Sequence, residues 1–356
     1  MVSGRKVTFP EFSHYNYAIK YFIEQGLETE YIMAPKMTVR TMERGAKHSP
    51  DFVCTPFKST LGSMMDALEA GADTILMTMG LCRLGYYGEL QEEILRGLGY
   101  EFEMINFSEY STGKKRDYIK ALKRINPKCS LAKATKGLTD AVRMIECLDD
   151  AESIYYKNCG FEKNKGSYKK LHKKFLTAME LATTRKEIDK AYNTFKKYAH
   201  EIPLDKPSNP LRVGVIGEYF TAVDAFSNLN LEQKLADMGV EMHRYMSITN
   251  RNFRYKAKNL AVETADYCKY EMGPTSTANI WCAKDYASKG FDGLVHIKSA
   301  GCTPEIDIMP VLQNISADYK IPVLYLTYDS QTSDTGLDTR LEAFYDMISM
   351  RKKVVL

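Results

Sequence analysis

The stretch GLVHIKSAGCTPEID at residues 293–307 decides the fold. Gly293–Ile297 is a mostly apolar run with β-branched residues, which is typical of a buried strand. A short turn through Cys302 follows, and Pro304 then suits a first helical turn because its fixed φ matches helical backbone. A strand that passes through a turn into a helix is the repeating unit of α/β folds.

The same alternation of strand and helix patterns occurs in two separate regions of the chain. In residues 1–110, strands are expected at Lys6–Phe9, Thr29–Met33, Asp51–Cys54, Thr74–Met79 and Phe102–Phe107. In residues 211–356, they are expected at Arg212–Ile216, Val240–Tyr245, Gly293–Ile297 and Val323–Tyr325. Helical periodicity between these runs predicts an α/β protein with two Rossmann-like or flavodoxin-like parallel-sheet domains.

Residues 111–200 lack strand patterns and read as a basic helical segment. Helices are expected at Tyr118–Ile125, Leu131–Cys147 and Leu171–Tyr198. The segment holds 22 Lys and Arg against 10 Asp and Glu, a net charge of +12, whereas the whole chain carries +4. Such a block either attracts an anionic ligand or acidic partner, or is a solvated helical face. Residues 201–210, EIPLDKPSNP, contain three prolines and read as a linker.

Composition excludes several classes of protein. The chain has 356 residues, 44% hydrophobic and 26% charged, as expected of a folded soluble protein with more than one domain. No stretch approaches the roughly 20 apolar residues that span a bilayer. The first residues, MVSGRKVTFPEF, contain no apolar run, so we expect no signal peptide and a cytoplasmic location. The basic segment lacks a nucleic-acid motif, so neither nucleic acid nor membrane is an expected partner.

The eight cysteines decide which function is expected. Disulfides are rare in the cytoplasm, so the cysteines are core residues, reactive thiols or metal ligands. Cys54, Cys82 and Cys302 each follow an expected strand at the turn into a helix. Ligands of open parallel sheets bind beyond the carboxyl ends of the strands. If the two domains face each other, the three cysteines converge at the interdomain cleft.

Three thiolates at these positions fit more than one kind of site. Zinc usually binds closely spaced pairs such as CxxC, and the sequence contains none. A [4Fe–4S] cluster held by three cysteines, with the fourth iron open, fits better. Inert thiols remain the alternative. His296, inside an apolar run, is expected to be a core histidine. Core packing is also expected for four cysteines in helix-like patterns, whereas Cys159 is ambiguous: Cys129, Cys147, Cys268 and Cys282.

Three segments carry a resemblance to a known family. They are VCTPFKSTLGSMMDALEAGAD at 53–73, MGLCRLGYYGELQEEIL at 79–95, and the tail from Lys298 to Ile348 with its Cys-Thr-Pro-Glu element. The tail also contains Gly336, Thr339 and Arg340. Together they resemble the 2-hydroxyacyl-CoA dehydratase subunits, and most closely the branch described as CoA protein activase or acyl-CoA dehydratase activase-related. The resemblance covers nearly the whole chain.

The resemblance implies a pair of α/β domains and a [4Fe–4S] cluster on Cys54, Cys82 and Cys302. Some relatives hold an [8Fe–9S] double-cubane cluster, which here would have to recruit Cys159, Cys268 or Cys282. An ATP-dependent activator iron–sulfur protein supplies low-potential electrons in this family. This chain has no GxxxxGK[ST] loop, so it is expected to accept electrons from such a partner.

The resemblance further implies an acyl-CoA thioester as substrate, a reductive or dehydration reaction, and pairing with a related subunit or a second copy. Glu305 and Glu89 are candidate bases or orienting groups, and both could equally cap helix N-termini. Arg83 could bind a phosphate or the thioester oxygen. Two other functions remain open: a non-catalytic iron–sulfur electron-transfer or assembly partner, and a scaffold whose cysteines bind nothing.

Overall fold

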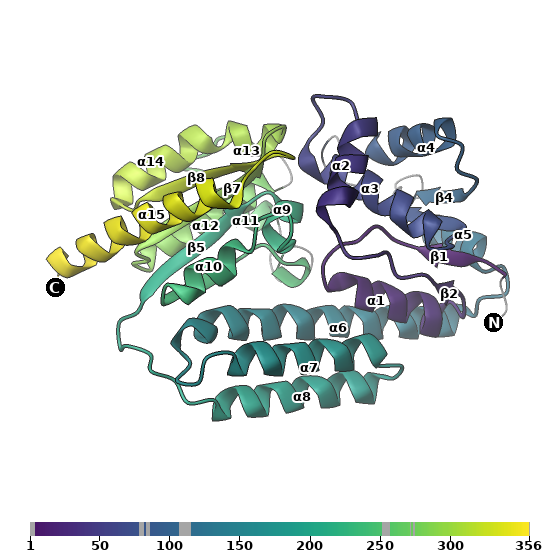
Figure 1. The fold of residues 1–356 in the computed structure, drawn as a ribbon, viewed down its shortest axis with the longest axis horizontal. Helices are drawn as coiled ribbons and strands as arrows, with labels where there is room; N and C mark the ends of the chain where they lie inside the picture. Colours follow the sequence, from purple (N-terminus) through teal and green to yellow (C-terminus); the bar gives the residue numbers. More distant parts are fainter. Residues whose placement is uncertain are drawn as a thin grey trace. The chain divides into compact units, whose positions relative to one another are not determined.

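Two four-stranded sheets, each entirely parallel, organise the chain (Figure 1). The computed structural model describes residues 4–77, 82, 86–106, 115–250, 257–270, 272 and 275–355. Contacts divide the chain into a first unit, Met1–Ile145 with Ala178–Asp189, and a second unit, Glu146–Thr177 with Lys190–Leu356. Parallel sheets with helices between successive strands confirm the predicted α/β fold with two sheet domains.

The sheet of the first unit has the strand order β2-β1-β3-β4. Its strands are β1 (Lys6–Thr8), β2 (Glu30–Tyr31), β3 (Thr74–Met77) and β4 (Glu103–Asn106). Val7 of β1 pairs with Tyr31 on one side and with Thr74 on the other. The chain moves outward in opposite directions from β1 and β3, so the switch point of the sheet lies between these two strands.

Helices cover both faces of this sheet. One face packs against α1 (Tyr15–Tyr21), its π-helical continuation at Phe22–Gly26, α5 (Lys115–Ile125) and the start of α6 (Leu131–Asn158). The other face packs against α3 (Thr55–Glu69) and α4 (Tyr87–Gly97), and α2 (Val39–His48) lies on α3. Met64, Ile75 and Ile105 are fully buried in these layers.

Two glycines let α2 and α3 approach closely. A Cβ on Gly45 would lie 1.8 Å from the carbonyl oxygen of Lys58, and one on Gly62 would lie 2.0 Å from that of Thr41. Any side chain at either position would force the helices apart. The pair α2–α3 therefore fixes where the amino end of α3 lies in the first unit.

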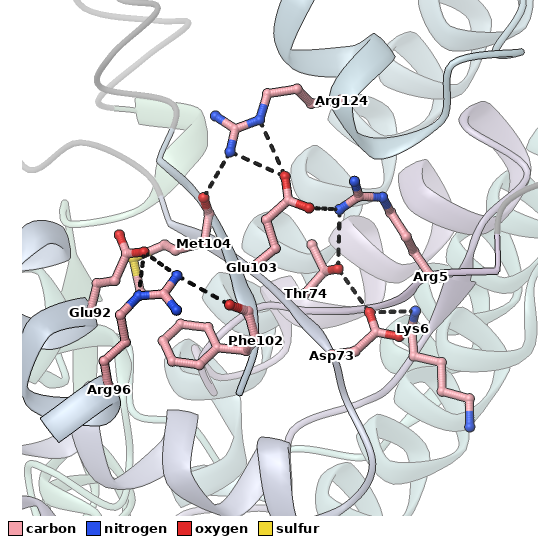
Figure 2. A network of polar contacts seen from close by, with 10 residues as sticks. All are labelled: Arg5, Lys6, Asp73, Thr74, Glu92, Arg96, Phe102, Glu103, Met104 and Arg124. Atoms are coloured by element: carbon pink, nitrogen blue, oxygen red, sulfur yellow. Dashed lines mark hydrogen bonds and ion pairs between the residues drawn. The ribbon is translucent and has the colours of Figure 1, made fainter. Parts of the chain in front are cut away.

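A polar network joins the amino ends of β1, β3 and β4 (Figure 2). Glu103 accepts hydrogen bonds from Arg5 and from Arg124, the latter at 3.1 Å to Nη2. Asp73 Oδ1 accepts from the backbone N–H of Lys6 at 3.0 Å and from Thr74 Oγ1 at 2.8 Å. These contacts stabilise the amino edge of the sheet, and the opposite, carboxyl edge carries the predicted cysteines of this unit.

The second unit repeats the same strand order, β6-β5-β7-β8. Its strands are β5 (Leu211–Gly217), β6 (Val240–Arg244), β7 (Gly293–Ser299) and β8 (Val323–Tyr328). One face packs on α10 (Leu231–Asp237) and α15 (Asp334–Val355), and the other on α12 (Ser276–Ser288) and α14 (Met309–Tyr319) (Figure 1). Two short helices, α9 (Tyr219–Val223) and α13 (Thr303–Asp307), begin just beyond β5 and β7, and α11 is Ala257–Glu263.

The predicted helical segment 111–200 consists of α5, α6, α7 (Ser167–Leu181) and α8 (Arg185–Glu201). The expected single helix Leu171–Tyr198 is wrong: α7 ends at Leu181, and Glu187 accepts hydrogen bonds from the N–H groups of Thr183 and Thr184 as α8 begins. The helices α6, α7 and α8 each contribute residues to both units. Among the described residues, no helix is long and apolar enough to cross a membrane.

Other local predictions need correction. Asp51–Cys54 is not a strand but a turn between α2 and α3, because Pro50 and Pro56 flank it and its amides have no sheet partner. Cys129 lies in the turn between α5 and α6, not in a helix. Parts of two predicted strands, 78–79 and 107, lie outside the described residues.

Candidate functional site

Cys54 lies at the carboxyl edge of the first sheet for a different reason than the sequence suggested. It is the N-cap of α3, with Pro56 in the first turn, and it is half-buried. The helix α3 leads into β3 and runs antiparallel to it, so its amino end lies at the carboxyl end of that strand. The Phe57 ring packs edge-on against Tyr87 of α4 at 4.6 Å, which places this turn beside the start of α4.

Cys82 belongs to the connection from β3 to α4 and is exposed. The connection leaves the carboxyl end of β3, so Cys82 and Cys54 belong to the same edge of the same sheet. Arg83, the candidate ligand for a phosphate or thioester oxygen, lies outside the described residues.

Glu89 lies in the first turn of α4 and is exposed. Its Oε1 accepts a hydrogen bond of 2.9 Å from Asn106 Nδ2 at the end of β4. The contact orients the carboxylate toward the carboxyl edge of the sheet. Because the side chain stays exposed, it remains accessible to a ligand there.

Cys302 is the N-cap of α13, just beyond β7, and is half-buried. In the order of its sheet, β7 takes the place that β3 takes in the first unit. Cys302 therefore corresponds in fold position to Cys82, since each follows the third strand of its sheet. The repeated Cys-Thr-Pro at Cys54 and Cys302 is not a repeated fold position: Cys54 precedes the third strand, and Cys302 follows it.

Glu305 is a fully buried carboxylate at the carboxyl end of β7. It accepts hydrogen bonds from Thr275 Oγ1 at 2.8 Å and from Asn279 Nδ2 at 2.9 and 3.0 Å. His296 Nε2, also fully buried, lies 2.9 Å from Glu305 Oε2. Side chains rather than helix amides thus bind Glu305. In this geometry it positions other groups and does not reach a substrate as a base.

Asn279 of α12 connects this carboxylate to the end of β5. Its Oδ1 accepts from the Gly217 N–H, and its Nδ2 donates to the Gly217 carbonyl, both at 3.0 Å. Gly217 has φ +141°, and a Cβ there would lie 1.9 Å from the Ile297 carbonyl oxygen, so only glycine fits. The switch point between β5 and β7 is therefore closely packed and rigid.

Lys298 is the least expected residue of this edge. It lies near the end of β7, and the residue is only 8% exposed. Burial lowers the pKa of Lys298, while the negative charges of Cys302 and Glu305 oppose that shift. Within the part of the chain that the structure describes, its ammonium group forms no hydrogen bond or ion pair. One feature of the sequence indicates this placement. His296 and Lys298 are two residues apart in an apolar strand, so their side chains lie on the same face of the sheet.

The other five cysteines differ from the predicted ligands. Four are buried: Cys129, Cys147, Cys159 and Cys282. Burial raises the pKa of Cys159 to about 12 and that of Cys282 well above its usual range, which favours the protonated thiol. Cys268 is half-buried, and its thiol donates a hydrogen bond to the Tyr270 carbonyl at 2.6 Å.

A polar cavity of about 150 Å³ lies elsewhere in the second unit. Its wall includes Asp149, Glu152, Glu232 and Arg244, and none of the predicted site residues lines it. Arg244 forms ion pairs with Glu152 and, at 2.5 Å, with Glu232. Part of the lining of this cavity is thus a charge network in which Arg244 pairs with two carboxylates.

The three predicted cysteine ligands have thiols that are accessible to a metal centre. Cys54, Cys82 and Cys302 are the accessible thiols at helix starts or strand exits, where free backbone N–H groups favour an anion. No cluster of three or more His, Cys, Asp or Glu side chains in metal-binding arrangement occurs among the residues that the structure places. No protein-family model and no curated protein matches this chain.

Proposed function

We propose that this chain is an iron–sulfur protein whose Cys54, Cys82 and Cys302 hold a [4Fe–4S] cluster. The cluster accepts low-potential electrons for a reductive or dehydration reaction on an acyl-CoA thioester. When bound, it supplies the one-electron chemistry that protein side chains lack. The resemblance to 2-hydroxyacyl-CoA dehydratase subunits motivates the reaction class.

The proposal is supported by one observation, the solvent accessibility of the three predicted cysteine ligands. The three predicted ligands are half-buried or exposed and lie at the carboxyl edges of parallel sheets, where such folds bind ligands. Four of the remaining cysteines are buried in cores. Coordination requires a thiolate, which the buried, high-pKa thiols disfavour. The same contrast favours a single cubane over an [8Fe–9S] cluster that recruits Cys159 or Cys282.

The chain's own residues would orient the ligand and limit access of water. Asn279 and His296 bind Glu305 in the first turn of α13, the helix whose N-cap is Cys302, and so restrain the position of this helix. Exposed Glu89 is the better placed of the two candidate bases, because Glu305 is fully enclosed. In this proposal Glu89 accepts or donates a proton at the substrate, and Glu305 positions Cys302.

An ATP-dependent activator iron–sulfur protein is the proposed electron donor. Two aromatic side chains next to the cysteines of the first unit are exposed to solvent, Phe52 at 96% and Tyr86 at 81%. Exposed aromatic residues are enriched at protein interfaces. They support docking of a protein donor close to Cys54 and Cys82.

The first test is the iron and acid-labile sulfide content of anaerobically purified protein, with EPR spectra after reduction. We expect about four irons per chain in the wild type. Cys54→Ala, Cys82→Ala and Cys302→Ala should each lose or degrade the cluster. Cys268→Ala is the matched control, because it removes a half-buried thiol outside the predicted set.

Other results would change or overturn the proposal. About eight irons, together with iron loss in Cys268→Ala, would indicate a double-cubane cluster. Absence of iron after anaerobic reconstitution would refute the iron–sulfur function. A full cluster that reduces normally but never acts on any acyl-CoA would leave the non-catalytic electron carrier as the function.

A further inference from the structure

The polar cavity of about 150 Å³ lies at the carboxyl edge of the second sheet, where open parallel sheets bind ligands. Met242 and Arg244 of β6 line it together with residues of the segment 247–250, which directly follows that strand. Glu232 lines it from the first turn of α10, and α6 supplies the remaining wall from the segment 149–157. All of these residues belong to the second unit. A cavity of this volume admits a ligand of roughly six non-hydrogen atoms.

The lining has more acidic than basic side chains. Within the described residues, four acidic and two basic side chains line the cavity: Asp149, Asp150, Glu152, Glu232, Lys157 and Arg244. Arg244 carries one positive charge and pairs with both Glu152 and Glu232. Asp150 accepts a hydrogen bond of 2.5 Å from the hydroxyl group of Tyr192, which is neutral. The described lining therefore carries an excess of negative charge.

Glu232 shows that the single guanidinium group of Arg244 does not balance this charge. The residue is only 4% exposed. Burial raises the pKa of Glu232, the charge of Arg244 opposes this shift, and the charge of Glu152 adds to it. Buried carboxylates are stable when opposite charges and hydrogen bonds compensate them. A second cation in the cavity would supply that compensation.

The neutral part of the wall also suits a ligand. Thr249 is 3% exposed, and its Oγ1 forms no hydrogen bond within the part of the chain that the structure describes. Buried hydroxyl groups normally have a partner, so a polar group of a ligand would complete this one. Met242 and the aromatic ring of Tyr156 contribute apolar surface, and organic cations bind favourably beside aromatic rings.

We propose that this cavity binds a small organic cation that carries N–H donors and a short apolar chain, such as an alkylammonium or alkylguanidinium ion. The charged end pairs with the carboxylates of Asp150 and Glu232, and the apolar chain contacts Met242 and Tyr156. None of the predicted cluster ligands lines the cavity, so this site goes beyond the proposed function and does not depend on iron.

The test is isothermal titration calorimetry of the full chain near neutral pH with four probes of equal chain length. They are n-butylammonium, n-butylguanidinium, n-butanol and butyrate. We expect at least one of the two cations to bind at one site per chain, about tenfold or more tightly than butanol or butyrate, because hydrogen bonds to ionised groups are the stronger ones. The bound cation should also raise the thermal unfolding temperature, since it binds only the folded chain.

Two variants locate the binding site. Asp150→Asn removes a charge and keeps an acceptor for Tyr192, so the dissociation constant of the cation should rise about tenfold. Glu232→Gln should have a similar effect, and it covers the case in which Asp150→Asn does not fold. Asp237→Asn is the matched control, because Asp237 is an exposed carboxylate of α10 that does not line the cavity. This variant should bind the cation like the wild type.

Three results would overturn the inference. The first is the absence of saturable binding of both cations to the wild type. The second is an equal loss of affinity in Asp150→Asn, Glu232→Gln and Asp237→Asn, which would indicate attraction by the overall charge and not binding in the cavity. The third is tighter binding of Mg²⁺ alone than of either organic cation, lost in the same two variants, which would assign the cavity to a metal ion. Each measurement is made on iron-free and iron-loaded protein, and the iron assay tests the proposed function separately.

Discussion

His296 of β7 and Glu305 of α13 lie 2.9 Å apart, and both side chains are fully buried. The contact joins the middle of the central strand β7 to the short helix α13, whose N-cap is Cys302. Asn279 extends it to Gly217 at the end of β5. The carboxyl edge of the second sheet is thus held by side-chain hydrogen bonds around one carboxylate.

The first prediction concerns this carboxylate. Glu305→Ala leaves the polar groups of Thr275, Asn279 and His296 buried without their acceptor, so we expect a loss of about 3–5 kcal/mol in the free energy of unfolding. Asp307→Ala, on the exposed side of the same helix, should change it by less than about 0.5 kcal/mol. Urea denaturation of both variants measures the difference. Equal effects would contradict the role of the network.

The second prediction concerns the close approach of α2 and α3. Gly45→Ala places a Cβ 1.8 Å from the Lys58 carbonyl oxygen, so the helices must separate. We expect a destabilisation of about 1–3 kcal/mol. Gly97→Ala in α4 has no atom within 4 Å of the added Cβ and should be neutral or stabilising by at most about 1 kcal/mol. Thermal unfolding distinguishes the two, and a neutral Gly45→Ala would refute the packing.

The third prediction concerns pH and Glu232. Burial raises its folded-state pKa from 4.5 to about 7, against the lowering effect of Arg244. Between these pH values the folded chain retains a proton that the unfolded chain releases. The contribution of Glu232 to the stability of the wild type therefore falls as pH rises from 4.5 to 7. Glu232→Gln lacks this contribution, so its stability relative to the wild type should increase across the same window.

Glu241 provides a control of opposite sign. Burial opposes ionisation, but hydrogen bonds from His243 and Lys206 outweigh it and lower the pKa of Glu241 to about 2. Its ionised form stabilises the fold above pH 4.5, and this contribution is lost as pH falls toward 2. Glu241→Gln should therefore be destabilised at pH 7 and resemble the wild type near pH 2. Denaturant titrations of Glu232→Gln and Glu241→Gln at several pH values test both glutamates. If the stabilities of the two variants relative to the wild type change with pH in the same direction, the opposite pKa shifts of the two glutamates are wrong.

The fourth prediction uses thiol chemistry in the metal-free protein. Alkylation rate depends on thiolate content and exposure. Cys82 is exposed, whereas Cys147, Cys159 and Cys282 are buried. We expect iodoacetamide to label Cys82 faster than these three by at least about an order of magnitude. Mass spectrometry of peptides after short exposure measures the rates. Comparable labelling of Cys159 would show that its buried, high-pKa setting is wrong.

The sequence alone determined the fold class and the approximate positions of the strands in both sheets, apart from the wrong strand at Asp51–Cys54. Runs such as Thr74–Met79 and Gly293–Ile297 consist mostly of apolar residues. Short, mostly apolar runs that are bounded by turn residues are typical of buried strands. The sequence also separated the positions of Cys82 and Cys302 from helical cysteines such as Cys147, because a strand followed by a turn is a local pattern.

Tertiary structure alone decided the setting of Cys54, Glu305 and Lys298. Asp51–Cys54 has strand-like residues, but no described strand pairs with it, and it forms the turn between α2 and α3, flanked by Pro50 and Pro56. Glu305 meets Asn279 and His296 only when three elements converge. Local pattern reports which backbone a segment favours, whereas burial and charge compensation depend on residues that are distant in the chain and adjacent only after folding.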